Sequence, residues 1–597
     1  MADNKQFIRR PDEMPEHRAQ VPRSSHDLGH DYTFTATCAH LMPVFYDFMN
    51  AGEEINLGFD FRLRTMPLDS AAMCSLAVHT EYFFVPMQLL YQPFSDWYYD
   101  ISEQFSSLFF ESGGTAGQIE KKLPQLDLNS LSTIIFGATG SEYSGYESTA
   151  LRVCRLFDML DYPINFIDVG TPDDFTPITG YTTFPYGLLA YNCIYQYFYR
   201  MDSREVFDPK TFNVDRFYST GSISDFGTRL ARTCAIKYRP VDNDYFTDIK
   251  VSPIVDVLNM NVSNELAAAQ SWLSRSANSV GTKVVSSGTV GDNASSGFIA
   301  LSNPSNFIQT KFGNVAGTSN SAVGNSIDIN TANIRAMFAS EKLWSITGRA
   351  KKRYDDQTLA HFGFNVPHDV KHEITRFGHD VTPIDIGEVI ATGASENVPL
   401  GEIAGKGYAG QSNRRHKFQA PCHGVVMMIM SIVPKLNYYD YRSKYTVMRT
   451  RDDLYTPEYD HLGMQPLFGY EMGYNNNYIN SVTGWQYRYE QWKRRFNKVS
   501  IAFSPRGSKG SWQLSRKPGY FDDLEFDWPN RQSYARFVHY PDELNSIFVP
   551  QYSISWSAAY AENVAEMYDL DPFVISGHIT AQLLSTMSDY SLPKLDA

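Results

Sequence analysis

The chain has 597 residues, of which 43% are hydrophobic and 20% are charged, as in ordinary globular proteins that bury a large core. Its net charge of −14 excludes a surface that grips nucleic acid over its whole extent, so any DNA contact must be local or assisted by a basic partner. The N-terminus has no apolar segment of a secretory signal, and no run of about 18 apolar residues predicts a membrane helix, so no membrane partner is expected.

The first predicted element is an N-terminal arm over residues 1–30, which are polar and of mixed charge. Such arms take a fixed course only where another part of the structure holds them. Downstream, short runs of β-branched and aromatic residues predict strands at Ala77–Pro86, Val425–Pro434, Ser546–Trp556 and Phe573–Leu584. Short strands separated by long irregular segments indicate an antiparallel sandwich or barrel, here treated as one domain after the arm, residues 31–597.

A few helices and insertions interrupt this pattern. Apolar residues recur at helical spacing across 94–109, 153–160 and 334–338, and we interpret each stripe as a core-facing side. Residues 276–326 are dominated by Ser, Gly, Asn and Thr and carry almost no charge, and a shorter patch covers 137–148. Both are predicted insertions between core strands, either linkers or surface loops ordered by their neighbours.

The sequence does not contain a complete cofactor motif. Gly405, Gly407 and Gly410 match GxGxxG, but no helical periodicity follows them and the next acid, Asp440, is too distant for dinucleotide binding. We predict a flexible glycine loop there. Paired carboxylates for glycoside cleavage cannot be read from sequence, because their separation is a tertiary property. We therefore predict no catalytic residue and no cofactor.

The sequence also contains no complete metal-binding motif. His368 and His372 are four residues apart, but neither the glutamate of HExxH nor a third ligand accompanies them. Asp242, Asp244 and Asp248 lack the glycine and terminal glutamate of a calcium loop. The six cysteines form no CxxC pair, which favours free thiols in a reducing compartment. No metal is predicted.

Three basic clusters are candidates for contact with single-stranded DNA, because aromatic side chains stack on bases while cations meet phosphates. The alternative for each cluster is a solvated charged face, and acidic residues directly follow the first cluster. The clusters are Arg349, Lys351, Lys352 and Arg353; Arg414 and Arg415; and Trp492, Lys493, Arg494 and Arg495.

Short segments of the chain, taken in order, resemble the major capsid protein of Microviridae, in the branch that includes the gokushoviruses. Each segment is short, but their common order is specific. Among them are Tyr82–Pro86 (YFFVP), Leu188–Asn192 (LLAYN), Asp244–Thr247 (DYFT), Thr382–Ile386 (TPIDI) and Arg449–Gln465, which ends in HLGMQ. The chain departs from the family just after YFFVP, where Met87, Gln88 and Leu89 stand near the position of a usual Arg or Asn.

The resemblance implies a mainly β fold, an eight-stranded antiparallel viral jelly roll with long loop insertions that contain a few helices. It implies self-assembly into a T=1 icosahedral shell around circular single-stranded DNA, in a virion assembled in the cytoplasm of a host bacterium. It also implies a small basic DNA-packaging protein, which fits the acidic net charge.

Family members carry a variable insertion after DYFT, which corresponds here to residues 250–326 and implies a protrusion at the three-fold axes that contacts a host cell-surface receptor. Its candidate contact residues are Ser276, Gly281, Gly291, Asn293, Asn314, Gly317 and Asn325. A secreted carbohydrate-binding or glycoside-cleaving β-sandwich is the competing interpretation, since it would also be aromatic-rich and acidic. The missing signal segment and the ordered family segments favour the capsid protein.

Overall fold

The structure is a computed structural model, and its description covers part of the chain. The described residues are 23–66, 73–94, 98, 126–127, 149–162, 182–183, 185–200, 207–213, 233–240, 242, 244–250, 284–286, 289–291, 339, 342–343, 345–347, 354–363, 373–390, 403–448, 451–460, 463–473, 482–504, 507–513, 515–516 and 571–587. The chain divides into two compact units. The first comprises residues 1–251, 367–460 and 465–597, and the second comprises 252–366 and 461–464.

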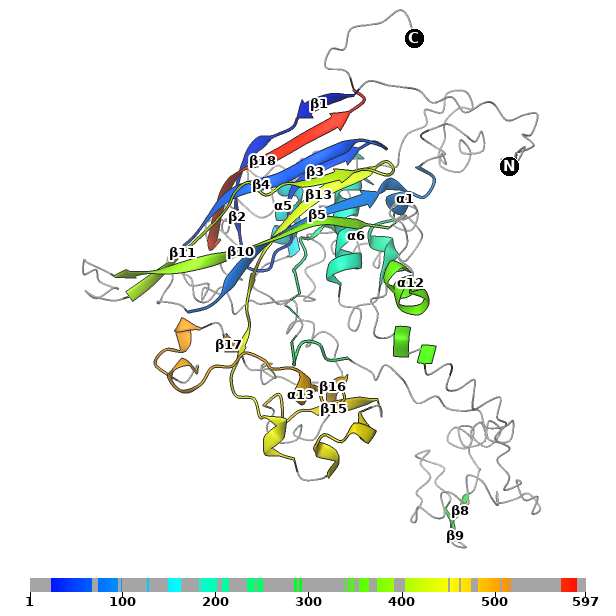
Figure 1. The fold of residues 1–597 in the computed structure, drawn as a ribbon, viewed down its shortest axis with the longest axis vertical. Helices are drawn as coiled ribbons and strands as arrows, with labels where there is room; N and C mark the ends of the chain where they lie inside the picture. The colour runs from blue at the N-terminus through cyan, green and yellow to red at the C-terminus, as the bar shows by residue number, and fades with distance from the viewer. Residues whose placement is uncertain are drawn as a thin grey trace, which may run out of the picture. The chain divides into compact units, whose positions relative to one another are not determined.

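A ten-stranded antiparallel sheet forms the first unit's framework (Figure 1). Two of its strands lie off the main path, β2 (His30–Ala36) beside β18 (Phe573–Ser585) and β12 (His416–Gln419) beside β4 (Glu54–Thr65). Along the path the order is β1 (Ser24–Asp27), β18 (Phe573–Ser585), β4 (Glu54–Thr65), β11 (Ile403–Gln411), β10 (Thr375–Ile390), β5 (Leu76–Pro86), β13 (Gly424–Pro434) and β3 (Met42–Met49).

The long strand β10 links two halves of this sheet. Its first part, Thr375–Ile384, pairs with β5, and its second part, Asp385–Ile390, pairs with β11. Each half contains four strands when β1 with β2, and β11 with β12, are counted as interrupted strands. The predicted mainly β, antiparallel architecture is confirmed, and the strand order is consistent with a jelly roll.

The predicted strands in the described part of the chain are confirmed. Every residue of β13 is buried, and β18 alternates between buried and more accessible positions along most of its length. The difference follows from their surroundings, because β13 lies between β5 and β3 and contacts helix α6 (Tyr186–Ile194), whereas β18 presents one face outward. The predicted strand Ser546–Trp556 lies outside the described residues.

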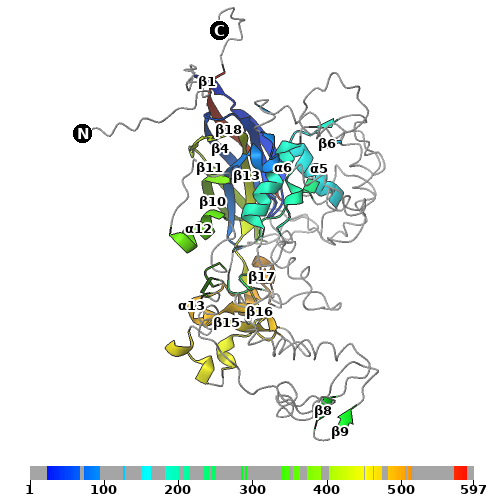
Figure 2. The same cartoon turned by 90° about the vertical axis from the view of Figure 1, so that its right-hand side faces the viewer.

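Two helices cover the half of the sheet that contains β3, β5 and β13 (Figure 2). The first, α5 (Thr149–Met159), contacts β3; the second, α6 (Tyr186–Ile194), contacts all three strands and continues into a π-helical turn, Tyr195–Tyr199. The predicted stripe at 153–160 is confirmed, since its apolar residues Val153, Leu156, Phe157 and Leu160 are buried. Of the other two predicted helices, the stripe at 334–338 and most of 94–109 lie outside the described residues.

The prediction of a flexible loop at the three glycines was wrong, because all three lie in strand β11. The backbone N–H of Gly407 donates to Thr65 Oγ1 at 2.7 Å, and a Cβ at this position would lie 2.6 Å from Thr65 Cγ2. Pairing with β10 and β4 therefore fixes this segment despite its low strand propensity.

Several short elements complete the first unit. Its small strand pairs are β6 (Leu126–Asp127) with β7 (Thr182–Thr183), β14 (Asn437–Tyr438) with β17 (Ser515–Arg516), and β15 (Met464–Phe468) with β16 (Val482–Tyr487). The first residue of β15, Met464, belongs to the second unit. Its short helices are α1 (Met87–Leu90) and α13 (Glu490–Lys493), and 3-10 turns lie at Pro209–Thr211, Lys444–Thr446, Arg451–Asp453, Pro457–Tyr459, Ile501–Phe503 and Gly510–Trp512.

The described part of the second unit consists of a hairpin and helical segments. Strands β8 (Val284–Ser286) and β9 (Thr289–Gly291) pair antiparallel, and α12 spans Tyr354–Phe362. Thr347 Oγ1 lies 3.0 Å from Nε2 of His361 in α12. Gly291 of the predicted host-contact set ends β9, and the other six members of that set lie outside the described residues.

Two observations concern the described residues as a whole. None of the helices there combines the length and the hydropathy needed to cross a bilayer. Five cysteines are free thiols, as predicted: Cys38, Cys74, Cys193, Cys234 and Cys422.

Candidate nucleic-acid interface

Arg414 and Arg415 lie in the link between β11 and β12, where both strands pair with β4. Asn413 takes the left-handed conformation here, with φ 62°, and its backbone N–H donates to Asp60 Oδ1 at 2.7 Å. A Cβ on Gly58 of β4 would lie only 2.2 Å from the Arg414 carbonyl oxygen. Glycine at position 58 therefore lets the link lie directly on β4.

Arg415 is held by a carboxylate on the same sheet. Its Nη1 and Nη2 atoms donate to Asp60 Oδ1 at 2.9 Å and to Oδ2 at 2.6 Å. The hydrogen bonds between these two side chains lower the pKa of Asp60 and raise the pKa of Arg415. This bidentate ion pair neutralises the Arg415 cation and fixes the link to β4.

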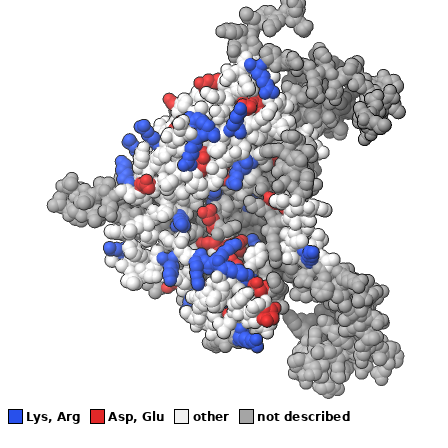
Figure 3. Space-filling view, viewed as in Figure 1, with Lys and Arg blue, Asp and Glu red and all other residues white. Residues whose placement is uncertain are grey.

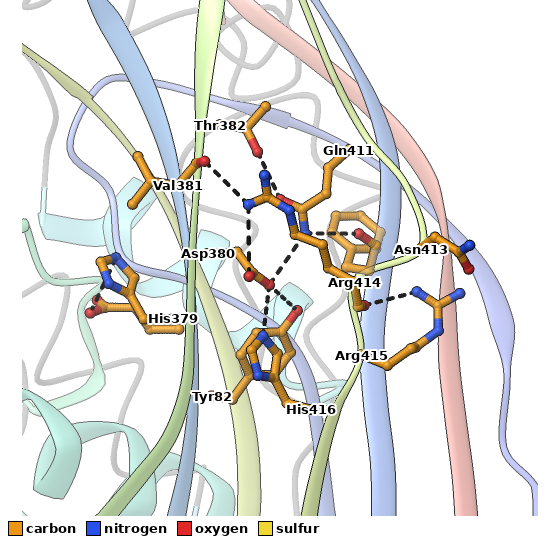
Figure 4. Close-up of polar contacts among 12 residues, drawn as sticks. Tyr82, His379, Asp380, Val381, Thr382, Gln411, Asn413, Arg414, Arg415 and His416 are labelled. Atoms are coloured by element: carbon orange, nitrogen blue, oxygen red, sulfur yellow. Dashed lines mark hydrogen bonds and ion pairs between the residues drawn. The ribbon is translucent and has the colours of Figure 1, made fainter.

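Arg414 belongs to a second network, centred on Asp380 of β10 (Figure 4). Its Nη1 donates to the Val381 carbonyl at 3.2 Å and lies 3.7 Å from Asp380 Oδ1. The other oxygen of Asp380 lies 3.0 Å from His416 Nε2 and 3.3 Å from the Tyr82 hydroxyl, which donates to it. The Arg414 side chain is 46% exposed, but its contacts stabilise the junction of β10, β11 and β12. Neither arginine of this cluster presents a cation without an acidic neighbour.

The Trp492–Arg495 cluster begins in α13, and its two central cations are paired. Lys493 Nζ lies 3.3 Å from Asp460 Oδ1. Arg494 lies 2.7 Å from Asp248 Oδ2 and 2.7 Å from Glu490 Oε1. Burial raises the pKa of Glu490, and Arg494 acts in the opposite direction. These two residues therefore stabilise the local fold.

Trp492 and Arg495 are placed differently from the cations between them. The Trp492 side chain is 47% exposed and packs edge-on against Tyr445, with ring centroids 5.2 Å apart. The Arg495 guanidinium lies over the same Tyr445 ring, 5.2 Å from its centroid, and no carboxylate in the described part of the chain forms an ion pair with it. Figure 3 shows Lys and Arg side chains gathered over the region that contains α13, with acidic side chains beside them. An exposed aromatic beside a cation can stack on a base and meet a phosphate.

The first predicted cluster, Arg349, Lys351, Lys352 and Arg353, lies outside the described residues. So do the histidines at 368 and 372. In the weak calcium-like segment, Asp244 Oδ1 accepts the backbone N–H groups of Phe246 and Thr247 at 2.8 and 2.9 Å. This carboxylate closes a local turn.

A buried charged network on β5 was missed by the sequence analysis. Glu81 Oε2 accepts from the Tyr199 hydroxyl and, at 2.8 Å, from Arg239 Nη1, while Oε1 accepts from Arg376 Nη1 at 2.8 Å. The Glu81 side chain is only 3% exposed. Arg239 also donates to Ser431 Oγ of β13 at 3.1 Å. The network joins β5, β10, β13 and the π-helical turn, and its one sequence signal is a single acid in a mostly apolar strand.

Known capsid proteins are similar to this chain along most of its length. A family model described as "Capsid protein (F protein)" matches residues 16–109 and 171–561. The chain belongs to this capsid protein family. It is also 22% identical over 568 residues to "Capsid protein VP1" of Chlamydia phage 1, which covers 83% of this chain and 87% of VP1. The predicted resemblance to Microviridae capsid proteins is confirmed, and the chain is a structural component of a virion.

Two histidines beside the Glu81 network predict that the capsid protein loses stability in acid. His79 Nδ1 lies 3.1 Å from His379 Nε2, and the rings stack 5.4 Å apart, so one ring donates and the other accepts. Burial, followed by the charge of Arg239, lowers the pKa of His79 to about 4, and burial also lowers the pKa of His379. The unfolded chain, with histidine pKa values of about 6.5, binds these protons first, so stability is lost as pH falls through the window between about 6.5 and 4.

We expect urea unfolding of the capsid protein to show a lower free energy of unfolding at about pH 5 than at about pH 7. The His79→Gln variant should lose less stability over the same interval, because one titrating group has been removed. Variant His578→Gln is the control, since His578 lies on the outward face of β18 and is half exposed. Equal pH dependence in the wild type and the His79→Gln variant would contradict the assignment.

Proposed function

We propose that the capsid protein assembles with copies of itself into a closed T=1 icosahedral shell that encloses circular single-stranded DNA. The observation that carries the proposal is the capsid family match along most of the chain, together with a strand order consistent with a jelly roll. A closed shell needs only modest free energy at each contact, because every subunit is held by several neighbours.

The surface near α13 supports association with other copies. Leu454 and Tyr455 are both more than half exposed, although Tyr455 packs edge-on against Tyr489 at 5.2 Å. Exposed Tyr and Leu side chains rimmed by charged residues are typical of protein interfaces, whose centres are aromatic-rich. Electron microscopy or sedimentation of the expressed chain tests the shell: closed particles of uniform T=1 size are expected. A chain that stays monomeric or dimeric under all conditions would overturn the proposal.

For the enclosed DNA, we propose that Trp492 and Arg495 form the contact. The exposed Trp492 ring can stack on a base while Arg495, supported by Tyr445, meets a phosphate. The net charge of −14 means that this contact cannot balance the charge of a genome by itself, so a small basic packaging protein belongs to the proposal.

Replacing Trp492 by Ala and Arg495 by Gln together should reduce the DNA content of purified particles, measured from their absorbance ratio at the nucleic-acid and protein maxima. Loss of stacking costs about 1–3 kcal/mol per base, so the effect at each subunit is severalfold or more. Lys493→Gln is the matched control, because Asp460 already neutralises this neighbouring cation. Unchanged DNA content in the double variant would reject this contact, and loss of the shells would assign the two residues to a subunit interface.

We propose further that residues 250–326 form a surface protrusion that contacts a host cell-surface receptor. The second compact unit begins at Ser252, close to the expected start of the insertion, although it extends to residue 366. Replacing residues 280–322 by a short Gly/Ser linker should leave shells intact and abolish attachment to host cells. Attachment at the wild-type level, or a chain that no longer assembles, would contradict this role.

A further inference from the structure

A polar pocket of about 400 Å³ lies in the first unit, and neither Trp492 nor Arg495 is among the residues that line it. It lies where the chain before β5, the chain after β13 and the segment 497–503 meet. The residues that line it are mostly polar and include Ser75, Lys435, Asn437, Lys498, Ser500 and Gln513. This volume lies within the range of small-molecule sites, about 300–1,000 Å³.

Backbone hydrogen bonds hold the walls of this pocket together. Lys435 N donates to the Ser75 carbonyl at 2.8 Å, and Met73 N donates to the Trp512 carbonyl at 2.7 Å. On another wall, Val499 N donates to the Tyr438 carbonyl at 3.0 Å. Because these segments come from distant parts of the chain and are tied to one another, the pocket exists before any ligand arrives.

The charge of the pocket is one-sided. Lys435 and Lys498 both line it, and no carboxylate does. Within the described residues, neither lysine forms an ion pair, whereas Arg415, Lys493 and Arg494 are all paired with carboxylates. Because two lysines and no carboxylate line this small pocket, the site favours an anion.

The neutral lining specifies what kind of anion fits. Asn437 Nδ2 donates to Gln513 Oε1 at 3.0 Å, and Gln513 Nε2 donates to the Met73 carbonyl at 2.9 Å. Each of these amide nitrogens carries a second N–H, and Ser75 and Ser500 add hydroxyl groups. Phe503, an aromatic residue whose ring centroid lies 6.0 Å from Lys509 Nζ, also lines the pocket. Lysines and N–H donors suit a phosphate, and an aromatic ring suits a base.

We propose that this pocket binds a nucleotide through its phosphate, with Lys435 and Lys498 as the phosphate ligands. The nucleotide has two sources with the same chemistry, a free nucleotide or an internal nucleotide of a packaged strand. The second source rests on the proposed enclosure of DNA, whereas phosphate binding does not. The site can therefore be measured on the full-length unassembled chain, independently of packaging.

The test is isothermal titration calorimetry, in which dAMP, inorganic phosphate or adenosine is added to the full-length protein. We expect dAMP to bind more tightly than phosphate, and adenosine to bind at least about tenfold more weakly than dAMP, because it lacks the charged group. The Lys435→Gln/Lys498→Gln variant should lose about tenfold or more in dAMP affinity, and so should Ser500→Asp, which keeps both lysines but adds a negative charge.

Lys417→Gln is the matched control, because this exposed lysine on β12 is paired with Glu54 and should leave dAMP affinity unchanged. Unfolding curves of each variant establish that it is folded. Absence of dAMP binding to the wild type, or equal affinity in the double variant, would overturn the site. Once binding is established, reduced DNA content in particles of the double variant supports a packaged nucleotide, and unchanged content supports a free one.

Discussion

Replacing Glu81 by Gln should lower the free energy of unfolding of the capsid protein by about 3–5 kcal/mol, since removal of one partner leaves buried charge uncompensated. Arg239, with a side chain 12% exposed, loses its carboxylate, while the more exposed Arg376 contributes less. The hydroxyl of Tyr199, a buried residue, also loses a charged acceptor. Urea unfolding near neutral pH measures the loss.

Glu54→Gln is the matched control for this prediction. Glu54 pairs with Lys417 across the outward face of the sheet, and the lysine side chain is 67% exposed. Solvent screens such a pair, so its loss should cost under about 1 kcal/mol. Similar losses in the two variants would show that the Glu81 network contributes no more than a surface ion pair.

The same network adds a second source of acid sensitivity. Burial by itself would raise the pKa of Glu81, but Arg239, the Tyr199 hydroxyl and the neighbouring cations lower it on balance. A depressed carboxyl pKa contributes stability that is present above the unfolded value, about 4.3, and is lost as pH falls through the folded value. Loss from Glu81 therefore begins at lower pH than loss from His79.

Replacing Asp571 by Asn should have an effect of similar size, about 3–5 kcal/mol, because it breaks a buried two-pronged pair. Arg155 of α5 donates to both Asp571 oxygens at 2.7 Å, and Thr35 Oγ1 of β2 donates to one of them at 2.7 Å. Asp571 lies just before β18, the last strand along the chain, so this carboxylate links helix α5 to the start of β18. Denaturant unfolding of the variant measures the loss.

A double variant separates the contribution of the ion pair from the cost of leaving one buried charge unpaired. Arg155→Met combined with Asp571→Leu should recover part of the loss, because neither member then remains as a buried charge. Asp31→Asn is the surface control, since Asp31 is 88% exposed where it pairs with His578. An Asp571→Asn variant as stable as the Asp31→Asn variant would contradict the assigned role.

Sequence patterns predicted the main strands of this protein correctly where the pattern itself is local. In β13 an apolar run, and in β5 a run of β-branched and aromatic residues, predict a buried strand from a few consecutive residues. The apolar residues of α5 repeat at helical spacing and predict its buried face. Order along the chain, not any single segment, revealed the capsid family, which the family model then confirmed.

The strand at Gly405, Gly407 and Gly410 could not be predicted in the same way. Glycine has a low intrinsic preference for strands, so the local pattern favoured a loop. The segment is a strand because β4 and β10 supply its hydrogen-bonding partners, and Thr65 lies 342 residues from Gly407 in sequence.

The sequence by itself determined that this is a β-rich capsid protein with acidic net charge and clustered cations. Only the tertiary structure decided which cations are neutralised. Arg415 meets Asp60 from 355 residues away, and Arg494 meets Asp248 from 246 residues away, whereas Lys435 and Lys498 line a pocket without a carboxylate. The physical reason is that side-chain charge is a local property of the sequence, but its compensation depends on distances that exist only once the chain has folded.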